Sequence, residues 1–86
     1  MPQISFFFGI TIYVQFLDHN PPHIHAIYNA CKASYRIDTA EMTAGKMTPR
    51  ADRLIREWIE LRRSELMKVW ELASKGQQVF PVPPLE

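Results

Sequence analysis

The sequence has 86 residues, of which 47% are hydrophobic, and a net charge of +1. This length gives one small domain, and the hydrophobic fraction is that of a folded globular protein, not of a disordered chain. The near-neutral charge excludes a strong overall attraction to nucleic acid or membrane, so nucleic-acid binding would require a local basic patch. The single cysteine, Cys31, excludes an internal disulfide framework and suits the reducing cytoplasm, where we expect the protein to reside.

The N-terminal segment predicts neither a signal peptide nor a membrane span. Met1–Ile4 carries no basic side chain, and the apolar run that begins at Phe6 is interrupted by Gly9 and by polar residues. The three consecutive phenylalanines Phe6–Phe8 are expected to pack in the core or at an edge of the fold. A part of this cluster left exposed to solvent would favour a homodimer, whereas no membrane partner is expected.

Residues 10–17, 23–28 and 31–38 alternate between apolar and polar side chains, a pattern typical of strands with one buried face. Asn29-Ala30 would form a two-residue turn, because asparagine tolerates a left-handed backbone. A short fourth strand around Glu41–Thr43 would place Met42 opposite Ile37. The first three strands of this antiparallel meander are predicted at residues 10–17, 23–28 and 31–38.

Pairing these strands separates the sheet into an apolar face and a polar face. The turn at residues 29–30 places His25 opposite Ser34, and a loop at residues 18–22 places Gln15 opposite the same histidine. A slip of one residue in either pairing would mix the two faces, so both loops support the same arrangement. The open polar face would then carry Tyr13, Gln15, His23, His25, Lys32, Ser34 and Arg36, with Asp18 and His19 at its rim.

The second half of the chain has the pattern of helices. Thr48-Pro49 is typical of a helix start, since a hydroxyl caps the first turn and proline suits its first position. Apolar residues recur at helical spacing from Ala51 to Ala73, but Arg62–Ser64 interrupts them and predicts two helices. The predicted fold is α+β: an antiparallel meander of three to four strands, with two C-terminal helices packed on one face as a two-layer sandwich. This domain would span residues 1–78, followed by an extended Pro-rich tail at 79–86.

All three histidines lie in the stretch Asp18-His19-Asn20-Pro21-Pro22-His23-Ile24-His25. His23 and His25 are two residues apart, so on a strand their side chains point to the same face. The two prolines exclude a helix there and stiffen the approach to the strand. This stretch is the candidate functional centre, and three interpretations of it remain open.

The first interpretation is acid–base catalysis without a cofactor. Imidazole exchanges protons near neutral pH, and His25 is the preferred proton-transfer group because it lies in mid-strand among polar neighbours. His23 would assist it, while Lys32 and Arg36 would stabilise a phosphate. Metal-independent cleavage of RNA needs little more, because the 2′-hydroxyl of the substrate is the nucleophile. The residues expected to bind substrate are Gln15, Tyr13, Ser34, Asp18 and His19.

The second interpretation is a divalent-metal site. His23 and His25, with either His19 or Asp18, would supply three ligands to zinc or a similar ion. No fourth ligand is evident, and the nearby positive charges would repel a cation. The third interpretation is structural: the stretch is a rigid turn, or its face binds a protein without catalysis.

Short motifs along nearly the whole chain add a family resemblance. The motifs are Pro2-Gln3-Ile4-Ser5, Phe7-Phe8-Gly9-Ile10, the Asp18–His25 stretch, Gly45-Lys46, Pro49-Arg50-Ala51, Glu57-Trp58, Leu61, Glu65-Leu66 and Trp70-Glu71-Leu72-Ala73. On these motifs the chain resembles the bacterial domain-of-unknown-function family numbered 4160. It departs from that pattern at Ala30 and Ala40, where a glycine or a more turn-prone residue is expected.

The resemblance implies a two-protein system. Such proteins are typically encoded beside a second small protein, in an arrangement like that of a toxin and its antitoxin, and this chain would be the toxin half. The expected function is therefore a cytoplasmic toxin-like module whose His23/His25 face cleaves or binds RNA and is covered by a cognate antitoxin-like partner. The alternative is a non-catalytic regulatory domain that binds protein or nucleic acid through the same face.

Overall fold

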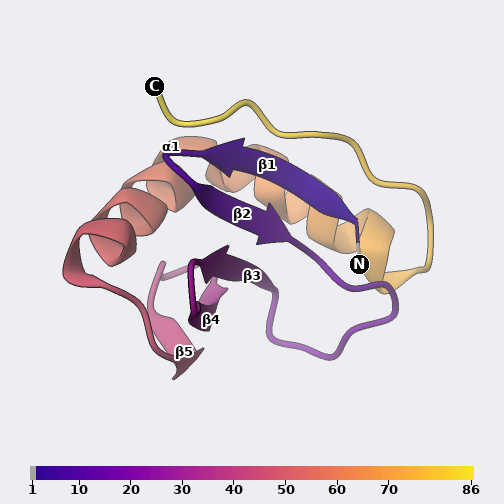
Figure 1. Cartoon of the computed structure of the whole chain (residues 1–86). Helices are drawn as coiled ribbons and strands as arrows, with labels where there is room; N and C mark the ends of the chain where they lie inside the picture. Colours follow the sequence, from indigo (N-terminus) through magenta and orange to yellow (C-terminus); the bar gives the residue numbers. More distant parts are fainter. Residues whose placement is uncertain (1) are drawn as a thin grey trace.

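Five antiparallel strands lie in the sheet in chain order, and one long helix packs across them (Figure 1). The computed structural model describes residues 2–86. The α+β class is confirmed, but the prediction of three to four strands and two helices was wrong in detail. The elements are β1 (Gln3–Phe7), β2 (Ile10–Tyr13), β3 (His23–Tyr28), β4 (Cys31–Arg36), β5 (Met42–Gly45) and α1 (Pro49–Ser74). In this described part of the chain, no helix has both the length and the apolar character to cross a membrane.

The strand absent from the sequence prediction is β1, which pairs with β2 through a turn at Phe8-Gly9. Both turn residues have positive φ, 50° at Phe8 and 80° at Gly9. A left-handed backbone is uncommon for a bulky aromatic residue, so the turn carried little sequence signal.

Two of the three consecutive phenylalanines are exposed to solvent, Phe6 by 56% and Phe8 by 48%. Such exposure is the condition under which the sequence favoured a homodimer, and the homodimer itself stays a prediction.

The pairing of β2 with β3 differs from the predicted register by two residues. His25 lies opposite Tyr13, not Gln15, because β2 ends at Tyr13 and a longer loop follows. Val14 leaves the β3 side, and its amide N–H donates to the Pro2 carbonyl oxygen at 3.1 Å. A shift of two residues preserves the faces of a strand, so the predicted separation of polar and apolar sides survives.

The pairing of β3 with β4 is confirmed residue by residue. Asn29 has φ of 53° in the turn, and His25 lies opposite Ser34 as predicted. The fourth predicted strand is β5, but its register was wrong: Met42 lies opposite Tyr35, not Ile37. The ladder is irregular between Ser34 and Tyr35, and alternation within a four-residue strand cannot fix such a register.

The helix begins as predicted, with the Thr48 side chain accepting a hydrogen bond from the Ala51 amide at 3.2 Å. The predicted break survives only as a kink at Arg62, whose φ of −111° and ψ of 20° are not helical. Ile59 and Leu66 on either side of the kink are fully buried in the same core. Both segments therefore pack into the same core, and α1 continues through the kink as one helix.

The C-terminal tail is extended and packs along β1 (Figure 1). The Val82 amide donates to the Ile4 carbonyl at 2.8 Å, and Trp58 Nε1 donates to the Pro83 carbonyl at 2.8 Å. Val82 and Leu85 are buried. The tail thus contributes to the core and covers the β1 edge of the sheet, while β5 forms the opposite edge.

Gly45, at the end of β5, is expected to tolerate no side chain. Its φ is +90°, and a Cβ atom there would lie 2.1 Å from the Lys32 carbonyl oxygen of β4. Gly45→Ala should lower the free energy of unfolding by at least about 2 kcal/mol, because the β4–β5 backbone must move apart. The matched control is Gly76→Ala, where φ is also positive but the new Cβ meets only the flexible Leu17 side chain. Urea unfolding of both variants tests this, and equal stability of the two would contradict it.

Candidate functional site

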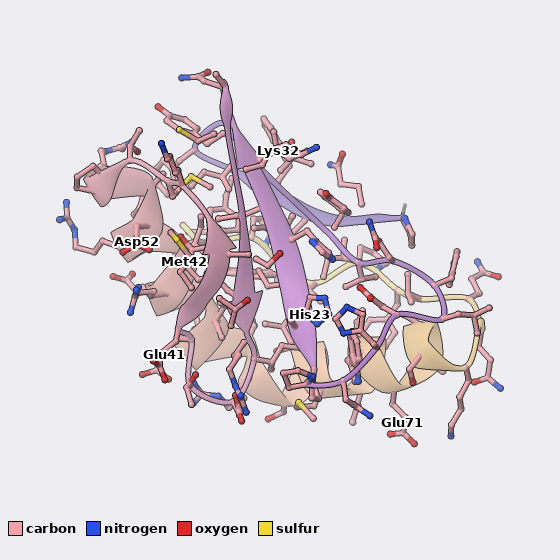
Figure 2. All side chains as sticks on the ribbon, turned by 90° about the horizontal axis from the view of Figure 1, so that it is seen from below. His23, Lys32, Glu41, Met42, Asp52 and Glu71 are labelled. Carbon is pink, nitrogen blue, oxygen red and sulfur yellow. The ribbon has the colours of Figure 1, made fainter. Side chains whose placement is uncertain are left out.

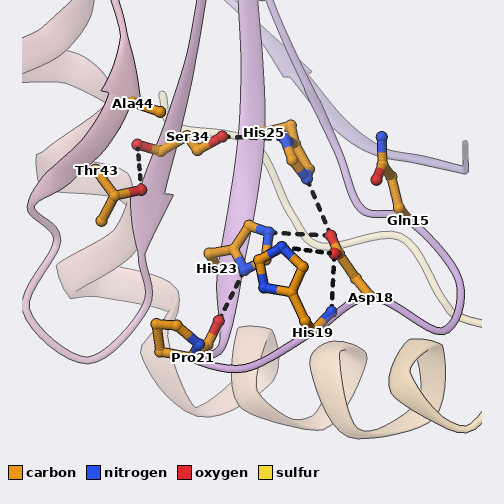
Figure 3. A pocket seen from close by; sticks show the side chains of 9 residues that line it. All are labelled: Gln15, Asp18, His19, Pro21, His23, His25, Ser34, Thr43 and Ala44. Atoms are coloured by element: carbon orange, nitrogen blue, oxygen red, sulfur yellow. Dashed lines mark hydrogen bonds and ion pairs between the residues drawn. The ribbon is translucent and has the colours of Figure 1, made fainter.

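The site is built where the Asp18 loop folds back over β3 (Figure 3). His23 and His25 project from the same face of β3, and both direct Nε2 at the Asp18 carboxylate. The distances to Asp18 Oδ2 are 3.0 Å from His23 Nε2 and 3.3 Å from His25 Nε2. Asp18, which the sequence placed only at the rim, is therefore the centre of the cluster.

Backbone hydrogen bonds hold the loop in this position. The Leu17 amide donates to the Ala73 carbonyl of α1 at 2.8 Å, immediately before Asp18. The His19 amide donates to Asp18 Oδ1 at 2.8 Å, and the Ile37 amide donates to the Pro22 carbonyl at 3.1 Å. The carboxylate is consequently fixed from the helix side and from the sheet side.

The second nitrogen of each ring also has a partner. His23 Nδ1 lies 2.7 Å from the Pro21 carbonyl oxygen, and His25 Nδ1 lies 3.2 Å from Ser34 Oγ (Figure 3). A carbonyl oxygen can only accept, so His23 must carry a proton on Nδ1. The Ser34 hydroxyl can donate to His25 Nδ1, which leaves the His25 Nε2 proton for Asp18.

Aromatic contacts restrict the motion of both rings. His25 stacks on Tyr13 with ring centroids 5.0 Å apart and planes at 14°. His23 packs against Trp70 of α1 at 5.0 Å and meets His25 edge-on at 4.9 Å. The side chains of His23 and His25 are 9% and 17% exposed, so the predicted open face is largely closed over the histidines.

Burial and hydrogen bonding shift the protonation of the cluster. Burial raises the pKa of Asp18, but hydrogen bonds from the His19 amide and the His25 ring, with the nearby His23 and His19 imidazoles, outweigh it and lower the pKa overall. Burial lowers the pKa of His25 by more than the hydrogen bond to Asp18 raises it. Near neutral pH the site therefore holds an ionised Asp18 beside a neutral His25.

A pocket of about 350 Å³ opens beside the cluster. Its walls come from the loop, from β3 and β4, and from β5 at the edge of the sheet. Figure 3 shows the lining residues, which are Gln15, Asp18, His19, Pro21, His23, His25, Ser34, Thr43 and Ala44. The volume suits a small polar group such as one nucleotide unit, not an extended ligand.

Two of the expected basic residues lie outside this pocket. Lys32 is opposite Ile27, away from His23 along the sheet (Figure 2), and lines a smaller neighbouring cavity of about 140 Å³ with Tyr13. Arg36 lies opposite His23 as predicted, but its guanidinium turns to Asp38, with Nη2 2.7 Å from Oδ2. This pairing lowers the pKa of Asp38 to about 2.

The remaining expected residues, Gln15, Ser34 and His19, all line the pocket. The His19 side chain is 84% exposed, and its Nε2 lies 3.7 Å from Asp18 Oδ1. Sequence reasoning missed the Pro21 carbonyl, the ring of Trp70, and the wall formed by Thr43 and Ala44. Of these features, the sequence indicated only the Pro21 carbonyl. The Pro21-Pro22 pair predicts a rigid turn, and a rigid turn beside a histidine presents its carbonyls in a defined direction.

A comparison with protein families identifies the family to which the chain belongs. The model of the domain of unknown function DUF4160 matches residues 9–71, which include the whole Asp18–His25 stretch. The chain belongs to this family. Neither the curated proteins nor the solved structures contain a significant match to it.

Proposed function

We propose that this protein is the toxin-like member of a two-protein pair, and that it cleaves RNA without a metal ion, with His25 as the proton-transfer group. The observation that carries the proposal is the chain of contacts from Asp18 through His25 to the Ser34 hydroxyl, at 3.3 Å and 3.2 Å. In this series of contacts the basic nitrogen, His25 Nδ1, faces a hydroxyl group at the pocket wall.

The chemistry follows from that arrangement. Asp18 accepts the Nε2 proton of His25 and so keeps the Nδ1 lone pair free. A ribose 2′-hydroxyl that takes the place of the Ser34 hydroxyl transfers its proton to Nδ1, and its oxygen attacks the adjacent phosphorus. The 5′-oxygen leaves with a proton from water at the open side of the pocket, and a 2′,3′-cyclic phosphate remains. Asp18 stabilises the imidazolium that forms.

The neighbouring groups suit a nucleotide. Lys32, Tyr13 and Ser34 line the smaller cavity next to His25, where an ammonium group can meet a phosphate. Arg36 would join them only by leaving Asp38, so we assign the phosphate contact to Lys32. We further propose that the cognate antitoxin-like protein covers the pocket, because the resemblance implies such a partner and the pocket lies open at the sheet edge.

Expression without the partner tests this proposal. We expect the unaltered protein to arrest bacterial growth and His25→Ala to relieve the arrest, since removing a general base costs roughly 10²–10⁴-fold in rate. Arg53→Ala, an exposed position on α1, is the control and should arrest growth like the unaltered protein. Growth arrest by His25→Ala at equal expression would remove His25 from catalysis, and no arrest by any of the proteins would favour the non-catalytic regulatory domain.

Ser34→Ala distinguishes RNA cleavage from a serine nucleophile, because a serine, a histidine and an aspartate are aligned here. If the 2′-hydroxyl is the nucleophile, Ser34→Ala loses only a contact, and purified protein should keep cleavage within about tenfold. Loss of cleavage as complete as in His25→Ala would instead identify Ser34 as the nucleophile and contradict the proposed mechanism.

A further inference from the structure

We infer that Asp18, His23 and His25 form a binding site for a divalent transition-metal ion, with Zn²⁺ the best fit. One ligand atom from each side chain lies within 4.8 Å of the other two. The Oδ2 of Asp18 is 3.0 Å and 3.3 Å from the two Nε2 atoms. Tetrahedral Zn²⁺ with bonds of about 2.0–2.1 Å separates its ligands by roughly 3.3 Å, so small rotations of buried side chains complete the site.

The proton positions point to a cation at this place. The Pro21 carbonyl requires the proton of a neutral His23 on Nδ1, which leaves the Nε2 lone pair directed at a carboxylate oxygen 3.0 Å away. A divalent ion between these two atoms would accept both lone pairs, and it would also lie within reach of His25 Nε2, which is 3.3 Å from the same carboxylate oxygen.

The outer hydrogen bonds match those of metal-binding histidines. Such histidines almost always donate their other ring N–H to a carbonyl or a carboxylate, which fixes the ring and increases its basicity. His23 has the Pro21 carbonyl in this role, and His25 has the Ser34 hydroxyl. Tyr13 and Trp70 further hold the two rings in place.

The structure removes two objections that the sequence raised against a metal. The guanidinium of Arg36 is paired with Asp38, and Lys32 lines the smaller cavity beside His25, not the main pocket where the three ligand atoms meet. Asp18 supplies the third ligand, and the pocket leaves the remaining coordination position to water. Two imidazoles and one carboxylate favour Zn²⁺ and its transition-metal neighbours over Mg²⁺ and Ca²⁺, which prefer oxygen ligands.

Metal binding would regulate the proposed activity, and this consequence alone rests on the proposed function. A neutral His25 that binds a metal through Nε2 carries its proton on Nδ1. Nδ1 is the atom that accepts the 2′-hydroxyl proton in the cleavage step, so the metal-loaded protein has no base. Zn²⁺ should therefore inhibit cleavage reversibly, and a chelator should restore it.

Calorimetric titration of the chelator-treated full chain with ZnCl₂ tests the inference. We expect one ion per chain, and a rise in melting temperature on the order of 10 °C when Zn²⁺ is about 100 times the dissociation constant. His23→Gln and Asp18→Asn should each weaken binding by about tenfold or more. His19→Ala should bind like the unaltered protein, and MgCl₂ should leave the melting temperature unchanged.

The outcomes separate this inference from the proposed function. The absorption spectrum of the Co²⁺-loaded unaltered protein provides a second measurement that does not depend on whether the variants fold, and a tetrahedral nitrogen–oxygen spectrum would support the site. Absence of binding up to millimolar Zn²⁺, or loss of binding only in His19→Ala, would overturn the inference even if RNA is cleaved. Zn²⁺ binding by a chain that cleaves no RNA would support the metal site and reject the proposed function.

Discussion

Asp18→Asn is expected to lower the rate of RNA cleavage by about 100-fold or more in the presence of a chelator. Asp18 acts through His25, so it is a positioning residue. Its carboxylate, 3.3 Å from His25 Nε2, fixes the proton there and stabilises the imidazolium formed in the reaction. The amide of asparagine has no charge, and its NH₂ group can bind Nε2 and move the ring proton to Nδ1. We therefore expect kcat to fall with little change in KM.

A nitrogen NMR spectrum of the imidazoles provides a readout that a purely structural role would not move. In the unaltered protein the proton of neutral His25 should lie on Nε2, and in Asp18→Asn a fraction should lie on Nδ1. Glu57→Gln removes a negative charge from an exposed position on α1 and serves as the control. An unchanged kcat in Asp18→Asn, or an equal loss in Glu57→Gln, would show that the carboxylate does not position His25.

The parts of the fold that depend on neighbouring residues could be predicted from the sequence. Asn29 accepts a left-handed backbone, and alternation on both sides of it sets the register that places His25 opposite Ser34. Thr48 and Pro49 likewise carry the helix start in their own side chains. In each of these cases, residues within a few positions of one another decide the conformation.

The parts that depend on distant contacts could not be predicted. Asp18 reaches the centre of the site because the adjacent Leu17 amide bonds to Ala73, which lies 56 positions away at the end of α1. Nothing in the Asp18–His25 stretch alone encodes that contact. Arg36 is different, since Asp38 is only two positions away, in the turn that follows β4, and its competition for the guanidinium was visible in the sequence.

The largest effect on stability is expected at Trp58. Its side chain is fully buried, its ring lies 5.2 Å from Phe7 of β1, and its Nε1 donates to the Pro83 carbonyl of the tail. Trp58→Ala should cost about 3–5 kcal/mol, against a total of roughly 4–13 kcal/mol for a domain of this length. We expect the melting temperature to fall by about 15 °C or more, measured by circular dichroism.

Two further variants on this residue and its helix separate packing from hydrogen bonding. Trp58→Phe keeps an aromatic ring against Phe7 but loses the bond to Pro83, so it should cost roughly 1–3 kcal/mol. Leu61→Ala removes a large apolar side chain that is 61% exposed, and it should stay within about 0.5 kcal/mol of the unaltered protein. Because Trp58 donates a hydrogen bond from α1 to the tail, hydrogen exchange at the Val82 amide should accelerate in Trp58→Phe before the β3–β4 amides change. Exchange that accelerates equally throughout the sheet would show that the tail is not an independent layer of the core.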